Sequence, residues 1–284
     1  MMEIKQVGII GCGAMGSGIA EVCARAGYQV VVREVNEGLL QKGMSAIEAS
    51  FAKGVSKGRL SPQEKDVVLN RITGTTNTRD LYACGLVIEA VAENMELKKQ
   101  IFTEMDKICP QDTILATNTS CLSIIDIAKT TNRPDKVLGM HFFNPAPIMR
   151  LLELVKTIAT SDETMAIGRE FGNSIGKTTI IAPDTTGFIV NRLFTPFQLS
   201  AIRMLEAGIA TREDIDTGLI YGTNMPMGML ALSDIIGLDT TMDVAEAFYE
   251  QTKEAIFAPP TLLRRMVAAG WLGRKSGRGF YEYQ

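Results

Sequence analysis

Residues 6–16 read QVGIIGCGAMG, an apolar run that passes directly into three closely spaced glycines. The run Gln6–Ile10 is typical of a short buried strand. Small and apolar residues then recur at helical spacing over Ala14–Ala26, and Tyr28–Val32 (YQVVV) is a second β-branched run. The order strand, glycines, helix, strand predicts that the chain opens with a βαβ unit.

The glycine spacing G-x-G-x-x-G has a physical reading in this context. Gly11 permits a tight turn, Gly13 lets the backbone approach a pyrophosphate, and Gly16 lets helix and strand pack closely. The helix N-terminus offers free N–H groups to the phosphates. Glu34 ends the second strand, where a carboxylate accepts hydrogen bonds from an adenosine ribose and repels a 2′-phosphate. We therefore expect NAD as cofactor, although Arg33 beside it leaves NADP possible.

Strand-like runs and helical patterns alternate over roughly the first 180 residues. This alternation predicts an α/β fold, a Rossmann-like and mainly parallel sheet with helices on both faces. The helical patterns include Glu96–Ile108 and Glu163–Ile175, and Ser61 is placed to start another helix. The later strand-like runs are Ile72–Thr75, Leu86–Ala90, Thr113–Ala116, Val137–Met140, Leu151–Val155 and Thr178–Ala182.

The character of the chain changes after Pro183. We expect residues 1–184 to form a dinucleotide-binding domain and residues 185–284 an all-α domain that serves substrate binding and dimerisation. Thr211 resembles a helix cap followed by acidic residues. The expected helices are Asn191–Ala207, Thr211–Ile220, Gly228–Ala247 and Thr261–Ala269.

Composition excludes several classes of protein. The 284 residues carry 29 Lys and Arg against 32 Asp and Glu, a net charge of −3 without a basic block, so we expect neither nucleic acid nor membrane binding. No run of about 18 apolar residues predicts a membrane span, and no signal peptide is apparent, so we expect a cytoplasmic protein. Five cysteines without a CxxC pair and one histidine, His141, argue against a disulfide framework or a metal site.

Polar residues cluster after two of the later strands. Ser120 follows one strand, and His141 and Asn144 follow the next. In an open parallel sheet, ligands bind outside the carboxyl ends of the strands, so these residues would face the cofactor. Glu153 lies in an apolar strand and needs a partner, for which His141 is the obvious candidate. A Glu–His pair suits general acid–base chemistry, although a lone histidine beside two phenylalanines is more often a packed core residue.

Several motifs together resemble the L-3-hydroxyacyl-CoA dehydrogenase family, and the chain is closest in length to its bacterial 3-hydroxybutyryl-CoA dehydrogenases. The resemblance runs through essentially the whole chain. It implies reversible oxidation of an L-3-hydroxyacyl-CoA to the 3-ketoacyl-CoA with NAD. The motifs are Asn118-Thr-Ser120, His141-Phe-Phe-Asn144-Pro145, Glu153, Gly187-Phe-Ile-Val-Asn191-Arg192 and Gly273-Arg-Lys-Ser-Gly-Arg-Gly279-Phe-Tyr281.

The resemblance also implies roles for individual residues. His141 matches the catalytic histidine, Glu153 its partner, and Ser120 and Asn191 the residues that hold the substrate. Contacts to coenzyme A match Ser50 and Lys57, although a solvated helix face explains Lys57 equally well. The implied cofactor-binding residues beyond the glycines and Glu34 are Glu93, Lys98, Asn144 and Lys275.

Three other functions stay open at this point. A related dehydrogenase acting on a sugar acid or another 3-hydroxy acid without CoA would share the dinucleotide and His–Glu motifs. A hydrolase would use Ser120, His141 and Glu153 as a triad, but Ser120 is not in a G-x-S-x-G turn. A non-catalytic dinucleotide-binding protein has no reason to keep all the matched residues. We also expect a homodimer through the helical domain, while acyl-chain length and pathway stay undetermined.

Overall fold

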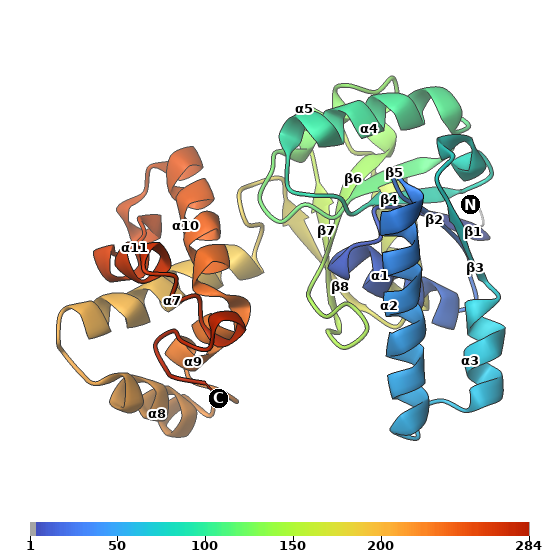
Figure 1. Ribbon diagram of the computed structural model, residues 1–284. Helices are drawn as coiled ribbons and strands as arrows, with labels where there is room; N and C mark the ends of the chain where they lie inside the picture. The colour runs from blue at the N-terminus through green and yellow to red at the C-terminus, as the bar shows by residue number, and fades with distance from the viewer. Residues whose placement is uncertain (1–3, 284) are drawn as a thin grey trace. The chain divides into compact units, whose positions relative to one another are not determined.

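The computed structural model describes residues 4–283 of the chain, which divides after Thr185 into two compact units. The larger unit contains the sheet, and the smaller is helical (Figure 1). The predicted fold class is therefore confirmed: a mainly parallel sheet with helices, followed by a helical C-terminal domain.

Within the described residues the larger unit has one sheet of eight strands, in the order β3-β2-β1-β4-β5-β6-β7-β8. The first six strands in this order, from β3 through β1 to β6, pair in parallel. Strand β7 runs antiparallel to β6, and β8 is parallel to β7. Every predicted strand occurs, within two residues at each end. The strands are β1 (Gln6–Ile10), β2 (Gln29–Arg33), β3 (Ile72–Thr75), β4 (Leu86–Glu89), β5 (Ile114–Thr117), β6 (Val137–Phe142), β7 (Leu151–Lys156) and β8 (Thr178–Pro183).

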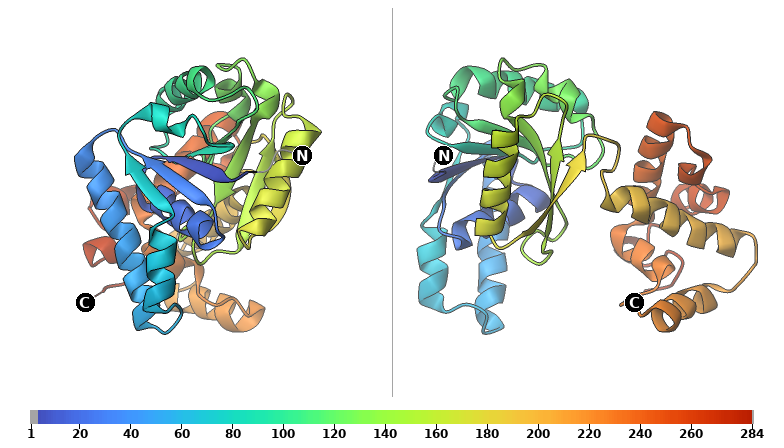
Figure 2. Two further views of the ribbon diagram at one scale, coloured as in Figure 1. Left: turned by 90° about the vertical axis from the view of Figure 1, so that its right-hand side faces the viewer. Right: turned by 180° about the vertical axis from the view of Figure 1, so that it is seen from behind.

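Helices cover both faces of the sheet, which explains why its strands are apolar runs rather than alternating patterns. Helices α1 (Ala14–Arg25) and α6 (Asp162–Ser174) pack on one face, and α4 (Met95–Ile108) and α5 (Ile124–Ala128) on the other (Figures 1 and 2). Helices α2 (Glu37–Ser56) and α3 (Pro62–Leu69) form a hairpin that projects beyond the sheet. The predicted start of α3 is confirmed, since Ser61 and Glu64 form a capping box.

The strand order places a topological switch point at the glycine segment. From β1 the chain moves to β2 and β3 on one side, and then returns to β4 on the other side of β1. The loops that leave β1 and β4 therefore diverge at the carboxyl edge of the sheet, where an open α/β sheet binds its ligand. The same edge receives the end of β6, which carries His141.

The smaller unit is built around α7, whose Leu199 and Ile202 are fully buried. The predicted start at Thr211 is confirmed, since its side chain accepts a hydrogen bond from the Asp214 N–H. The prediction of one helix over Gly228–Ala247 is wrong. Gly237 adopts φ +104°, a left-handed conformation that ends one helix and starts the next. The helices are α7 (Val190–Glu206), α8 (Arg212–Thr223), α9 (Met229–Ile236), α10 (Leu238–Thr252) and α11 (Thr261–Ala268).

Two buried aspartates fix the last residues of this unit. Asp234 accepts hydrogen bonds from the N–H groups of Phe280 and Tyr281 and from the hydroxyl of Tyr283, each at 2.9 Å. Asp216 accepts the hydroxyl of Tyr281 at 3.0 Å. Such bonds satisfy buried donors and hold the aromatic tail against the helices. Among residues 4–283, no helix is long and apolar enough to cross a membrane.

Candidate active site

The glycine loop between β1 and α1 has the geometry that its spacing predicts. Gly11 adopts φ +92°, which only glycine tolerates easily. A Cβ on Gly16 would lie 1.8 Å from the Gly11 carbonyl oxygen, so the first turn of α1 packs against the loop without room for a side chain. A Cβ on Gly13 would meet nothing within 4 Å, so the backbone there borders open space. The loop therefore fits a pyrophosphate at the helix N-terminus.

Glu34 lies beside this loop, at the end of β2. Its Oε1 accepts a hydrogen bond from the Cys12 N–H at 2.6 Å, and its Oε2 accepts one from the Val35 N–H at 3.0 Å. The carboxylate thus stands where an adenosine ribose would reach it. Arg33 precedes it, and its buried Nε has no hydrogen-bond partner among residues 4–283.

His141 and Glu153 form a buried pair at the same edge of the sheet. They face each other across the antiparallel strands β6 and β7, and His141 Nδ1 lies 2.7 Å from Glu153 Oε2. The side chains are 4% and 0% exposed. The Phe143 ring packs on the imidazole, with ring centroids 4.6 Å apart. The antiparallel pairing of β7 with β6 brings a carboxylate from the neighbouring strand to the imidazole and orients it.

The loop after β5 carries Ser120 and is held by two neighbouring elements. Asn118 Oδ1 accepts a hydrogen bond from the Phe142 N–H at 2.8 Å, which ties this loop to the strand of His141. Glu93 Oε1 accepts bonds from the Thr119 hydroxyl at 2.5 Å and the Ser120 N–H at 2.8 Å. The sequence motifs thus place Ser120 and the end of β6 in one connected network.

Glu93 stays ionised because of its neighbours. Burial raises its pKa, but the Lys98 ammonium, the Thr119 hydroxyl and two backbone N–H groups outweigh burial and hold the pKa below its ordinary value. Lys98 Nζ lies 3.4 Å from Glu93 and 2.6 Å from Glu89, and its side chain is 0% exposed. Its ammonium is therefore enclosed between two carboxylates.

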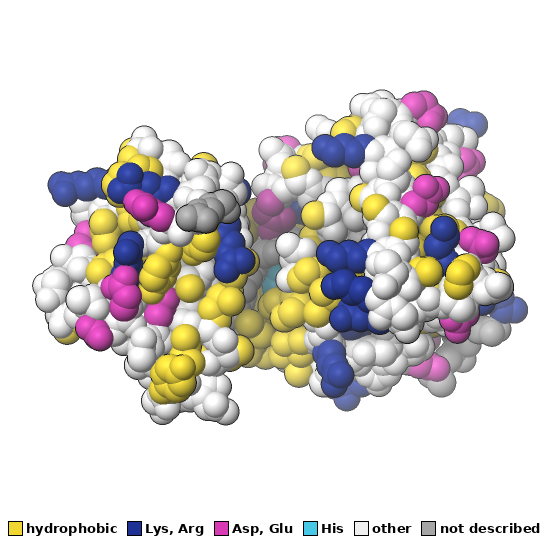
Figure 3. All heavy atoms as spheres, turned by 60° about the horizontal axis from the view of Figure 1, so that its bottom comes forward, with side chains coloured by type: hydrophobic (Ala, Val, Ile, Leu, Met, Phe, Trp, Pro, Cys, Tyr) yellow, Lys and Arg dark blue, Asp and Glu magenta, His cyan; other side chains and the backbone are white. Residues whose placement is uncertain are grey.

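A groove of about 450 Å³ runs along α1 and α2 and under the segment that follows β6. It begins at Ala14 and Ser17, next to the glycine loop, and Ser50 lines its middle and donates to Glu21 Oε2 at 2.6 Å. Figure 3 shows Lys and Arg side chains gathered beside an apolar patch on one face of the larger unit. The basic residues that line the groove are Arg25, Lys53, Lys57 and Arg59.

Comparison with known proteins agrees with this geometry. The NAD-binding domain model of 3-hydroxyacyl-CoA dehydrogenase matches residues 6–185, and the C-terminal domain model of the same enzyme matches residues 187–283. The chain belongs to the 3-hydroxyacyl-CoA dehydrogenase family. It is therefore an NAD-dependent oxidoreductase, and the larger unit is its NAD-binding domain.

Individual relatives match over their whole length. A 3-hydroxybutyryl-CoA dehydrogenase of Mycobacterium tuberculosis is 48% identical, with 99% of each chain covered. A probable 3-hydroxybutyryl-CoA dehydrogenase of Bacillus subtilis is 43% identical, covering 100% of this chain and 99% of the other. The crystal structure of (S)-3-hydroxybutyryl-CoA dehydrogenase from Ralstonia eutropha superimposes with a TM-score of 0.95 at 42% identity, covering 99% of this chain and 100% of that one.

The remaining predicted residues of this dehydrogenase lie apart from that network or in the other unit. Asn144 is exposed and is the second residue after the end of β6. Asn191 lies in the first turn of α7, and Lys275 Nζ lies 2.5 Å from Asp239 Oδ2, both within the smaller unit. Among residues 4–283, no group of three or more His, Cys, Asp or Glu side chains is arranged to hold a metal ion.

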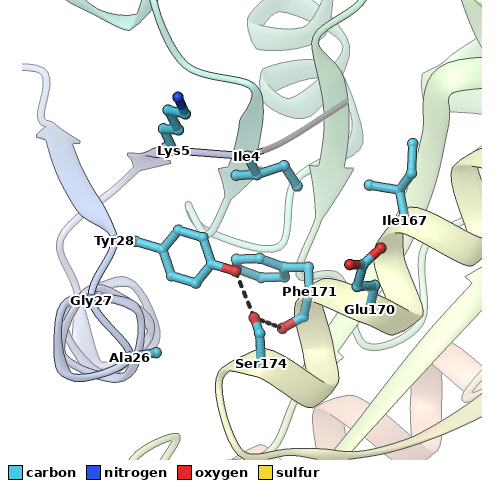
Figure 4. Close-up of a pocket in the computed structure, with 9 residues that line it drawn as sticks. All are labelled: Ile4, Lys5, Ala26, Gly27, Tyr28, Ile167, Glu170, Phe171 and Ser174. Carbon is cyan, nitrogen blue, oxygen red and sulfur yellow. Dashed lines mark hydrogen bonds between the residues drawn. The ribbon is translucent and has the colours of Figure 1, made fainter. Parts of the chain in front are cut away.

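A separate hollow of about 470 Å³ lies where β1 and β2 begin, at the opposite ends of the strands (Figure 4). The Tyr28 hydroxyl and the Ser174 hydroxyl are hydrogen-bonded at 2.6 Å, and the Tyr28 ring packs on Phe171. None of the predicted site residues lines it.

Sequence reasoning did not single out Glu89, Asn118 or Thr119 as site residues. Glu89 ends an apolar strand and is 1% exposed, and such a carboxylate needs a partner. The need of a buried carboxylate for a partner, which paired Glu153 with His141, applies equally to Glu89. Its partner Lys98 was instead expected to bind the cofactor.

Proposed function

We propose that this enzyme oxidises short-chain L-3-hydroxyacyl-CoA, such as 3-hydroxybutyryl-CoA, reversibly to the 3-ketoacyl-CoA. The observation that carries the proposal is the buried His141–Glu153 pair at the carboxyl edge of an NAD-binding sheet. Relatives that match over their full length are named 3-hydroxybutyryl-CoA dehydrogenases, which supports a four-carbon acyl group.

His141 acts as the general base in this proposal. Its Nδ1 is bonded to Glu153, so the proton of the 3-hydroxyl passes to Nε2 while the hydride leaves C3. NAD, when bound, accepts that hydride. In the reverse direction the protonated imidazole gives its proton to the ketone oxygen. Glu153 stabilises the imidazolium through a charge-assisted hydrogen bond.

Ser120 and Asn191 hold the reacting part of the substrate in this scheme. Ser120 lies on a loop whose backbone is fixed by Glu93 and whose neighbour Asn118 binds the strand of His141. A hydroxyl fixed in this way orients the oxygen on C3 for proton transfer. Asn191 contributes from the start of α7, and its amide offers both a donor and an acceptor.

The groove along α1 supports coenzyme A as the carrier of the acyl group. Its lining runs from Ala14 to Arg25, about 17 Å along the helix, which suits the length of an extended pantetheine arm. The end distant from the glycine loop is basic, with Arg25, Lys57 and Arg59, and suits the phosphates of a nucleotide. Ser50 is placed between the two ends, where a pantetheine amide would pass.

A homodimer through the helical domain is part of the same proposal. Helix α7 exposes Leu193, Phe197 and Met204 by 72%, 41% and 40%. Their spacing places them along one side of the helix, where a second copy would cover them. Light scattering should give the mass of a dimer, and Leu193→Asp should reduce it; a monomer for the unchanged chain would contradict this part.

Oxidation of NADH with acetoacetyl-CoA, with acetoacetyl-pantetheine and with free acetoacetate tests the substrate class. We expect turnover with both thioesters and little with the free acid. Equal turnover of acetoacetate would favour a dehydrogenase of free hydroxy acids. No turnover of any of the three compounds, with normal NADH binding, would contradict the proposed function.

Lys57→Ala tests the groove, with Lys107→Ala as the matched control on an exposed part of α4. An exposed ion pair contributes at most about 1 kcal/mol, so KM for acetoacetyl-CoA should rise up to about fivefold in Lys57→Ala only. The KM for the pantetheine thioester, which lacks the nucleotide, should stay the same in both variants. An equal rise in KM for both thioesters would contradict a contact between Lys57 and the nucleotide part of coenzyme A.

A further inference from the structure

A buried group of charges lies directly behind the loop of Ser120. Glu89 ends β4 and is 1% exposed, and Lys98, in the first turns of α4, is 0% exposed. Burying a carboxylate and an ammonium costs free energy that an ion pair recovers only with good geometry and further hydrogen bonds. A buried ion pair of this kind adds little net stability to the fold, so we expect it to have another role.

Both oxygens of the Glu89 carboxylate are engaged. Oε1 lies 2.6 Å from Lys98 Nζ and accepts the Val91 N–H at 2.7 Å, and Oε2 accepts the Thr117 hydroxyl at 2.7 Å. The carboxylate is thus fixed by strands β4 and β5 and by the backbone that follows β4. It offers Lys98 one rigid acceptor.

Lys98 connects the fixed Glu89 carboxylate to the Ser120 loop. Its ammonium also lies 3.4 Å from Glu93 Oε2, and the other oxygen of Glu93 binds the N–H groups of Ser120 at 2.8 Å and Cys121 at 3.3 Å. A continuous series of contacts therefore joins the buried Glu89 to the backbone of Ser120. Glu93 is 36% exposed, so without Lys98 its Oε2 would lose its cation and turn toward solvent, which would loosen the bonds that Oε1 accepts from the loop.

We propose that Glu89 is a positioning residue for the dehydrogenase reaction: it holds Lys98, which holds Glu93, which sets the backbone of Ser120. The proposal rests on the substrate-holding role given to Ser120 above. Glu89 touches neither substrate nor cofactor, and acts only through these two charged neighbours.

Glu89→Gln tests the proposal because the amide keeps the shape of the side chain and removes its charge. The matched control is Asp106→Asn, which alters another buried acid whose bonds go to Arg133, at 2.8 Å, and to Asn132. Both variants should unfold at lower temperature than the unchanged enzyme. Below those temperatures, Glu89→Gln should lower kcat/KM for acetoacetyl-CoA at least tenfold, and Asp106→Asn less than twofold.

The double variant Glu89→Gln/Lys98→Met separates positioning from stability. Removing both charges should restore much of the thermal stability, because no unpaired charge stays buried. It should not restore kcat/KM, because Glu93 still lacks its cation. The NADH dissociation constant is measured for every variant, and kcat/KM for acetoacetyl-CoA is compared at saturating NADH, because Glu89 lies opposite Ile10, next to the glycine loop.

The outcomes are distinct. Recovery of kcat/KM together with stability in the double variant would overturn the proposal, and so would equal kinetics in Glu89→Gln and Asp106→Asn. If Glu89→Gln does not fold, a folded double variant with kcat/KM lowered tenfold or more supports the proposal, and one with normal kcat/KM refutes it. Absence of acetoacetyl-CoA turnover in the unchanged enzyme would instead count against the proposed function.

Discussion

Glu153→Gln probes the strongest single interaction at the site, the 2.7 Å contact with His141 Nδ1. Glutamine keeps an oxygen for the imidazole N–H, so the ring orientation survives, but the negative charge is lost. The two side chains are 0% and 4% exposed, so water does not replace that charge. A hydrogen bond to a charged group contributes about 1.5–3 kcal/mol.

Loss of the free energy of this hydrogen bond should lower kcat almost exclusively. The imidazolium forms only as the proton leaves the substrate, so the carboxylate stabilises the transition state more than the ground state. At about 1.4 kcal/mol per factor of ten, kcat should fall about 10- to 150-fold. The KM for L-3-hydroxybutyryl-CoA and the affinity for NAD should change little, because the Glu153 side chain is 0% exposed.

The assay is steady-state reduction of NAD with L-3-hydroxybutyryl-CoA, well below the unfolding temperature of the variant. Glu163→Gln, an exposed acid at the start of α6, is the matched control and should keep its kcat within twofold. A kcat for Glu153→Gln within twofold of the unchanged enzyme would show that the pair is structural. A fall in NAD affinity that accounts for the lost rate would point the same way.

Three further substitutions test other parts of the account. Gly16→Ala should abolish NADH binding by fluorescence titration, because its Cβ would lie 1.8 Å from the Gly11 carbonyl oxygen; retained affinity would contradict the tight packing of the loop. Asp234→Asn should cost about 1–3 kcal/mol in urea unfolding, because the amide leaves a buried donor of the C-terminal tail without an acceptor; an unchanged midpoint would refute this. Glu93→Gln should lower stability at neutral pH, and the difference from the unchanged enzyme should vanish in acid. The pKa of Glu93 is lowered in the folded state, so its contribution is complete above the ordinary glutamate pKa of about 4.3 and is lost as pH falls through the lowered value. A difference that grows on acidification would contradict that sign.

Local signals predicted most of the fold. Apolar runs bounded by turns are strands wherever both faces of a sheet are covered, and glycines at G-x-G-x-x-G spacing mark one turn geometry. The break between α9 and α10 at Gly237 could not be predicted from local signals. The residues on either side of it have one continuous helical periodicity, and only the packing of two helices decides that the glycine adopts φ +104°.

The site was less accessible to sequence reasoning, because it depends on which strand ends meet. Glu153 could be paired with His141 on chemical grounds alone, but the antiparallel register of β7 that places them opposite each other has no local signature. Lys98 illustrates the reverse case. Its position in a motif predicts a contact with the cofactor, but no signal in the sequence indicated that its ammonium lies 2.6 Å from Glu89 and 3.4 Å from Glu93.

The most direct test of the central claim is the fate of the transferred hydrogen. The enzyme should reduce acetoacetyl-CoA with NADH that carries deuterium at both C4 positions, and mass spectrometry should locate the label in the product. The account predicts L-3-hydroxybutyryl-CoA with one deuterium at C3, and a His141→Gln variant that binds NADH normally but forms this product 10²–10⁴-fold more slowly, the range expected for loss of a general acid. Product of the D configuration, product without deuterium, or an undiminished rate in His141→Gln would contradict it.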